Sequence, residues 1–169
     1  MTRLVAEAPE QVQALPPTQE ESPADRQEAA YWLTPVASDD KQMAEEVIQT
    51  LVGDSGIYAF GERTTGRGKL KPRDWMCFYA SGKGVVAYAR VSSMPEKKPH
   101  QKVRHSDKYP WVFQLTQSVL YLDNPMVIDF ETRTMLDAFK DRDPNQPWDW
   151  FVQGTRAINE HDFQIVTRQ

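Results

Sequence analysis

The chain has 169 residues, 40% of them hydrophobic, 11% aromatic and 26% charged, with a formal net charge of -4. This length suits one domain with a single core, and the hydrophobic fraction excludes a chain that is disordered throughout. Its one cysteine, Cys77, excludes a disulfide framework and a thiolate zinc site. No apolar run approaches the ~18 residues that a membrane helix needs, so we expect a cytoplasmic protein.

Residues 1–29 are predicted to be a disordered acidic tail that is rich in Pro, Glu and Gln. The tail contains six acidic and two basic side chains, a net charge of -4, and very few apolar residues. Such a segment buries too little apolar surface to offset the entropy lost on folding. Residues 30–169 are therefore the predicted folded domain, and the domain itself is neutral.

Charge is unevenly distributed within this domain. Residues 62–108 contain twelve Lys and Arg against four Asp and Glu, a net charge of +8, and residues 123–150 are correspondingly acidic. A basic face of this kind meets phosphates through its local potential even when the whole protein is acidic. The alternative is a solvated face without a ligand.

The first third of the domain combines strand and helix patterns. Tyr31–Val36 has the composition of a short strand. Asp39 with Gln42 three residues later predicts a capping box at the start of an amphipathic helix that ends at Gly53. Residues 56–60 predict a second short strand.

The middle of the chain has the strongest strand signals. After a glycine-rich charged loop over residues 61–69, residues 75–80 are apolar on both alternating faces, which is typical of a strand buried on both sides. Residues 81–84 form a turn that leads to a further strand over 85–91. Together they predict a hairpin at the centre of a sheet.

The last third returns to helices. A polar, basic loop over 92–109 precedes a predicted strand from Trp111 to about Tyr121 and a short helix near residues 132–140. Asn159 predicts the N-terminus of a final helix. Strands in the middle and helices at the ends predict an α+β, barrel-like domain.

Several short motifs then stand in an order that is similar to one known family. They are Tyr31-Trp32-Leu33, Gly56-Ile57-Tyr58, Lys71-Pro72-Arg73-Asp74 before Cys77-Phe78-Tyr79, Gly84 to Val91, and Phe151 to Ile158. In this order they resemble the EVE domain, a relative of the YTH, ASCH and PUA domains, over about residues 31–166. The first loop departs from the family's Trp-Asp-Gly-Val-Arg-Asn pattern. The resemblance implies a PUA-like mixed β-barrel flanked by short helices.

The resemblance also implies a function. It points to a nucleic-acid-binding module that reads one modified base, with a modified cytosine such as 5-methylcytosine in DNA as the expected ligand. It further implies a role in modification-dependent restriction, with an effector nuclease or another chain as partner. A reader of methylated RNA and a module that binds an acidic protein partner are the alternatives.

Reading a base in this way requires aromatic rings that replace its lost stacking and polar groups that meet its edge. Stacking contributes ~1–3 kcal/mol per base, about the cost of unstacking it. The predicted pocket residues are Trp32, Tyr58, Phe60, Tyr79, Trp148 and Trp150. Asp149 is the predicted acceptor for the amino group of cytosine. The alternatives are that Trp148 and Trp150 plug one end of the barrel and that Asp149 bonds its own backbone.

The basic loops are expected to hold the nucleic-acid backbone. The predicted phosphate-binding residues are Arg63, Arg67, Lys69, Lys97, Lys98, Lys102 and Arg104. Three histidines and one cysteine form no catalytic or metal-binding pattern, and no segment matches a nucleotide-binding loop. We therefore expect a binding protein that is not an enzyme and needs no cofactor or metal.

Overall fold

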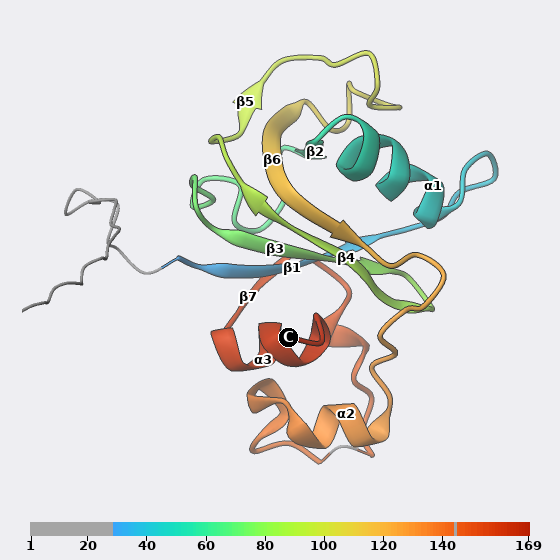
Figure 1. Cartoon of the computed structure of the whole chain (residues 1–169), viewed down its shortest axis with the longest axis vertical. Helices are drawn as coiled ribbons and strands as arrows, with labels where there is room; N and C mark the ends of the chain where they lie inside the picture. The colour runs from blue at the N-terminus through green and yellow to red at the C-terminus, as the bar shows by residue number, and fades with distance from the viewer. Residues whose placement is uncertain (1–28, 144) are drawn as a thin grey trace, which may run out of the picture.

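Seven strands form one mixed sheet that curls on itself, with short helices on both sides (Figure 1). The computed structural model describes residues 29–143 and 145–169. The strand order is β2-β6-β4-β3-β1-β7, and β5 pairs with β6. The predicted α+β class, a mixed barrel-like sheet flanked by short helices, is confirmed. The predicted disordered tail, apart from Ala29, lies outside the described residues.

Within the described residues, the sheet has seven strands, five of which lie close to their predicted positions. They are β1 (Tyr31–Val36), β2 (Ile57–Phe60), β3 (Trp75–Ala80), β4 (Gly84–Val91), β5 (Glu96–Lys97), β6 (Trp111–Leu120) and β7 (Arg156–Ile158). β1 runs parallel to β3, the other pairs are antiparallel, and the predicted β3-β4 hairpin lies at the centre of the sheet. The sequence did not predict β5 and β7, because strands of two and three residues carry no alternation.

The helices are short. They are α1 (Ala44–Ile48), the π-helix η2 (Gln49–Asp54), α2 (Phe130–Met135), the 3-10 helices η3 (Asp137–Phe139) and η4 (Asp149–Phe151), and α3 (Glu160–Val166). Asn159 begins α3 as predicted, since its side chain accepts the backbone N–H of Asp162 at 2.8 Å. The predicted helix over 132–140 divides at Leu136, whose backbone is extended. None of the helices in the described part of the chain has the length and apolar content to cross a membrane.

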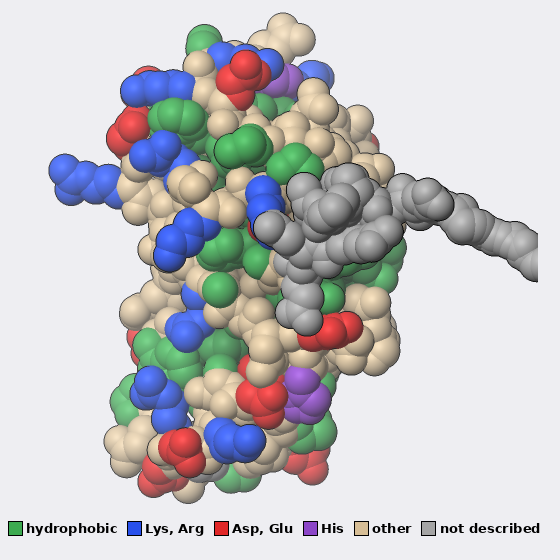
Figure 2. Space-filling view, turned by 90° about the vertical axis from the view of Figure 1, so that its left-hand side faces the viewer, with side chains coloured by type: hydrophobic (Ala, Val, Ile, Leu, Met, Phe, Trp, Pro, Cys, Tyr) green, Lys and Arg blue, Asp and Glu red, His purple; other side chains and the backbone are tan. Residues whose placement is uncertain are grey.

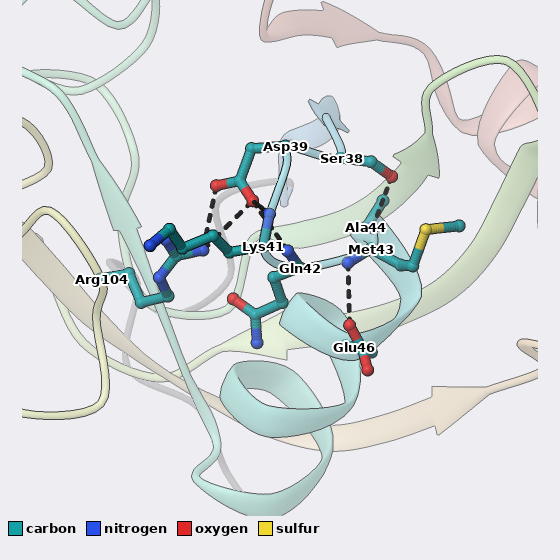
Figure 3. A network of polar contacts seen from close by, with 8 residues as sticks. All are labelled: Ser38, Asp39, Lys41, Gln42, Met43, Ala44, Glu46 and Arg104. Carbon is teal, nitrogen blue, oxygen red and sulfur yellow. Dashed lines mark hydrogen bonds and ion pairs between the residues drawn. The ribbon is translucent and has the colours of Figure 1, made fainter.

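The start of α1 differs from the prediction. Asp39 accepts the backbone N–H of Gln42 at 2.8 Å, but this bond closes a turn before the helix (Figure 3). The helix begins at Ala44, where the carboxylate of Glu46 accepts the N–H of Met43 at 2.8 Å. The predicted capping box therefore lies four residues too early, which leaves Asp39 on an exposed turn.

Side chains of the central strands alternate between two cores on opposite faces of the sheet. Trp32 and Phe78 pack with α1 on one face, whereas Leu33, Cys77 and Tyr79 pack with α3 on the other. Figure 1 shows α1 and α3 on opposite sides of the sheet. Full burial of one such side chain contributes ~1.5–3 kcal/mol. Position parity in β1 and β3 therefore decides which face an aromatic ring reaches.

The barrel stays open along one line. β2 pairs only with β6, and the second half of β1, residues 34–36, pairs only with β3. Within residues 29–143 and 145–169, no ladder joins β1 to β2. We call this opening between residues 34–36 and β2 the seam.

Candidate nucleic-acid interface

Two neighbouring clefts lie along the seam. The first, of about 310 Å³, is bounded by residues 35–39, the α1–η2 helices and residues 102–105, and is called the helix-side cleft. The second, of about 290 Å³, is bounded by Thr34, residues 63–65 and residues 154–155, and is called the loop-side cleft. Both clefts share the side chains that separate them, which are Pro35, Tyr58, Ala59 and Tyr109.

Tyr58 forms the floor of both clefts. Its ring meets Phe78 and Phe113 edge-on, with centroids 5.1 and 6.2 Å apart. Burial raises the pKa of the Tyr58 hydroxyl above its ordinary value, and the nearby Tyr109 adds to this shift. The phenol is therefore neutral at physiological pH, and it offers one donor and one acceptor at the cleft floor.

Tyr109 forms an exposed wall. Its residue is 46% exposed, and it follows the basic loop that leads into β6. Gly61 lets the chain at Lys108 and Tyr109 pack closely against residue 61. A Cβ at this position would lie 3.1 Å from the Lys108 carbonyl oxygen and 3.8 Å from the Tyr109 ring. Tyr109 was not among the predicted pocket residues, although an aromatic residue at the end of a polar loop is the same signal that indicated Tyr58.

A hydrogen-bonded carboxylate stands at the rim of the helix-side cleft. Asp39 accepts the backbone N–H groups of Lys41 and Gln42, and Arg104 lies 2.9 Å away from its Oδ2 (Figure 3). The Lys41 N–H above all, with Gln42 and Arg104, holds the pKa of Asp39 below its ordinary value. The ion pair also ties the basic loop to the turn before α1. The cleft thus has an ionised acceptor beside two cations, Lys102 and Arg104.

The interior of the same cleft is apolar. Leu51, Ala59 and Val103 are buried in one hydrophobic cluster, and Val47 packs against it. These side chains line the helix-side cleft together with its charged groups. A ligand with one polar edge and one apolar edge matches this division.

Three of the predicted pocket residues have structural roles. Phe60 is buried against Phe113, with the ring centroids 4.8 Å apart, although it also lines the loop-side cleft. Trp32 is buried below Gly66, and its indole N–H donates to Asp74 at 3.0 Å. Gly66 has φ +88°, and a Cβ there would lie 2.5 Å from the Trp32 ring. Tyr79 packs in the core on the other face of the sheet.

Trp148, Asp149 and Trp150 also lie on that other face. Trp150 packs against Phe139, with the centroids 4.9 Å apart, and it lines a separate cleft of about 250 Å³ on that face. Both Trp150 and Trp148 are half-buried against the core that includes α3. The Asp149 carboxylate accepts from Gln153 at 2.8 Å. The prediction that Tyr58 and these two tryptophans line one pocket is therefore wrong. The sheet β1-β3-β4 stands between them, and the carboxylate at the seam is Asp39.

Several predicted phosphate-binding residues are engaged within the protein. Lys97 pairs with Glu62 at 3.1 Å and Lys98 with Glu96 at 3.0 Å. The guanidinium of Arg67 lies 4.2 Å from the centroid of the Trp111 ring. Arg104 pairs with Asp39, as described above. Their charges are thus partly offset before any ligand arrives.

The remaining three cations have no such partner. Arg63, Lys69 and Lys102 form no ion pair within the described residues. Figure 2 views the molecule from the side on which β5 lies in Figure 1, and Lys and Arg side chains are spread over its upper half among a few acidic ones. Of these three residues, Arg63 and Lys102 line the clefts of the seam.

Comparisons with known proteins give matches only among solved structures. No family model and no curated protein matches the chain. A structure described as the YTH domain-containing protein mmi1 and RNA complex matches with 12% identity and a TM-score of 0.49, over 83% of this chain and 78% of that chain. Protein Atu2648 from Agrobacterium tumefaciens matches with 18% identity and a TM-score of 0.49, over 83% and 92%. The Toxoplasma CPSF4-YTH domain in apo form matches with 12% identity and a TM-score of 0.49, over 88% and 93%. The EVE assignment stays a prediction from the sequence.

Proposed function

We propose that this chain is a reader of nucleic acid that holds one extruded, modified base in the helix-side cleft. The observation that carries the proposal is the cleft itself, where an exposed tyrosine, an ionised carboxylate and an unpaired lysine meet at an opening of the sheet. Its volume of about 310 Å³ lies at the lower end of the ~300–1,000 Å³ range of small-molecule sites, which suits one base. A modified cytosine in DNA is the proposed ligand.

The rim and the interior of the cleft match the two edges of such a base. The ionised Asp39 is an acceptor for the exocyclic amino group of cytosine, and its Oδ2 has a lone pair beyond the one used by Arg104. The apolar wall of Leu51, Ala59 and Val103 suits a methyl group. Burying one methyl group contributes about 0.8 kcal/mol, or about fourfold in affinity. Selectivity for the modification by burial alone is therefore modest.

Base extrusion has a cost that the rings offset. Unstacking a base costs a few kcal/mol in a duplex and least in a single strand. Stacking against Tyr109 returns ~1–3 kcal/mol, and Lys102 and Arg63 add attraction to phosphates. We therefore expect single-stranded targets to bind more tightly than duplexes.

The chain binds the base without changing it. In support, the Cys77 thiol is buried and its pKa is raised by desolvation, so it does not provide a thiolate nucleophile. Incubation with a modified oligonucleotide, followed by mass spectrometry of its nucleosides, should return the modified base in full. Conversion of the base would contradict a pure reader. A role in restriction through an effector nuclease follows from the resemblance alone and stays a prediction.

The proposal is tested by fluorescence anisotropy with short single-stranded oligonucleotides that differ in one base. The arms are cytosine and 5-methylcytosine in DNA, and adenine and N6-methyladenine in RNA. We expect the tightest binding to the 5-methylcytosine strand. Preference for the methylated RNA would support the alternative RNA reader, and equal binding of each modified strand and its unmodified control would overturn the proposal.

A matched pair of variants locates the site. Tyr109→Ala removes the exposed ring of the seam, and Phe130→Ala removes an equally exposed ring, 46% in both cases, at the start of α2. We expect Tyr109→Ala to weaken binding of the modified strand by about 5- to 150-fold, which corresponds to ~1–3 kcal/mol. Phe130→Ala should leave binding unchanged. Full affinity and selectivity in Tyr109→Ala would place the base elsewhere.

A further inference from the structure

The two clefts of the seam share walls and differ in charge. Tyr58 and Tyr109 line both of them, so a ligand in one cleft borders the other. The helix-side cleft has one carboxylate, Asp39, together with the cations Lys102 and Arg104. Among the described residues that line the loop-side cleft none is Asp or Glu, and Arg63 is its one guanidinium. Of the two clefts, the loop-side cleft is therefore the one that presents a cation without a carboxylate among its described lining residues.

The loop that carries Arg63 has a fixed turn. The hydroxyl of Thr64 accepts the backbone N–H of Gly61 at 2.9 Å, and the N–H of Thr64 donates back to the Gly61 carbonyl at 3.3 Å. Because Thr64 uses its hydroxyl oxygen as an acceptor here, its O–H remains available as a donor. Arg63 itself is exposed and forms no ion pair within the described residues. A donor and a free cation are therefore presented by one pre-formed turn.

A pair of threonines from other segments adds a further donor to the loop-side cleft. The hydroxyls of Thr34 and Thr155 lie 2.7 Å apart and are buried, and both residues line the cleft. In such a pair one hydroxyl donates and the other accepts, so one O–H is left to donate to a ligand. Hydroxyl groups on two sides and one guanidinium form a donor set that suits phosphate oxygens.

We propose that the loop-side cleft binds the phosphate of the same nucleotide whose base occupies the helix-side cleft. This inference rests on the proposed function for its base. Arg63 attracts a phosphate with no carboxylate beside it, whereas a phosphate in the helix-side cleft would lie beside the Asp39 carboxylate. The loop-side cleft is therefore the better phosphate site of the two. The ligand class is therefore a nucleotide held at two points, and a nucleoside alone fills half of the site.

The experiment compares 5-methyl-2′-deoxycytidine with its 5′- and 3′-monophosphates by calorimetric titration of the full chain. We expect one monophosphate to bind about tenfold or more tightly than the nucleoside, because hydrogen bonds to a charged group are the stronger ones. Arg63→Gln should remove this increment and leave nucleoside affinity unchanged. Lys69→Gln is the matched control, since Lys69 is an exposed, unpaired cation of the same loop that does not line the cleft.

Two results would overturn the inference. One is equal affinity for the nucleoside and both monophosphates. The other is an equal loss in Arg63→Gln and Lys69→Gln, which would indicate diffuse attraction. If the nucleoside does not bind, the proposed base-reading function fails. Titration with inorganic phosphate then tests separately whether the loop-side cleft binds phosphate. Amide shifts at Thr64 and Thr65 that disappear in Arg63→Gln would support it, and their absence in the wild-type chain would refute it.

Discussion

The two faces of the central sheet both combine aromatic rings with arginine, but they differ in how much of each ring is left exposed. On the α3 side, Trp150 packs on Phe139 and is contacted by the guanidinium groups of Arg142 and Arg156, 4.1 and 4.9 Å from its ring centroid. On the seam side, Tyr109 is 46% exposed and borders two clefts. At the unpaired opening of the sheet, an exposed aromatic residue thus forms the shared wall of two clefts, whereas on the α3 side Trp150 lines a single cleft of about 250 Å³. There its ring is held by Phe139 and two guanidinium groups.

The largest expected effect is a loss of stability on the α3 side of the sheet, without a loss of base preference. Trp150→Ala removes a half-buried ring together with two cation contacts, and we expect a loss of about 2–3 kcal/mol in the free energy of unfolding. Denaturant unfolding measures this loss. The same variant should keep the preference for the modified strand wherever it is folded. A folded Trp150→Ala that has lost the preference would move the base site to the α3 side.

The next effect concerns the two carboxylates that could read the base. Asp39→Asn should weaken binding of the modified strand by about fivefold or more, because the amide presents donors where the cytosine amino group needs an acceptor. Asp149→Asn is the matched control on the other face and should bind as the wild-type chain does. Anisotropy titrations of both variants measure the difference. Weaker binding in Asp149→Asn, with unchanged binding in Asp39→Asn, would indicate that Asp149 reads the base.

Asp39 also predicts how binding depends on pH. Its pKa is lowered in the folded protein, so the carboxylate stays ionised down to pH values below its ordinary value of 3.8. Its contribution to folding is accordingly present above pH 3.8 and is lost only as the pH falls through the lowered pKa. We therefore expect binding through Asp39 to be constant between about pH 8 and pH 5. A midpoint near neutral pH would mean that a group other than Asp39 controls binding, and His105 also lines this cleft.

The smallest effect should distinguish lysines within the basic stretch. Lys102 lines the helix-side cleft without an ion pair among the described residues, whereas Lys98 pairs with Glu96 at 3.0 Å. Lys102→Gln should lower the slope of log affinity against log salt by about 0.7, the value of one single-strand phosphate contact. Lys98→Gln should change the slope less. Equal slopes would mean that the basic stretch acts only as a diffuse field.

The sequence alone determined the elements whose signals are local. The doubly apolar run of β3, the turn into β4 and the Asn159 cap each depend on neighbouring residues, and each appears where it was predicted. The excess of basic residues over 62–108 is likewise a property of composition. β5 and β7 were missed because their pairing with β6 and β1 joins segments far apart in the chain.

Only the tertiary structure decided which side chains meet. Tyr58 and Trp150 both follow the same sequence rule, yet parity along the strands and the packing of the C-terminal segment place them on opposite faces of the sheet. For the same reason, the carboxylate that lies at the seam is Asp39 and not the predicted Asp149. Side chains in a strand alternate with a period of two, whereas the side of the sheet to which a later segment returns depends on the burial of the whole core. A sequence pattern therefore predicts the alternation within a strand, but it does not predict the side of the sheet to which a later segment returns.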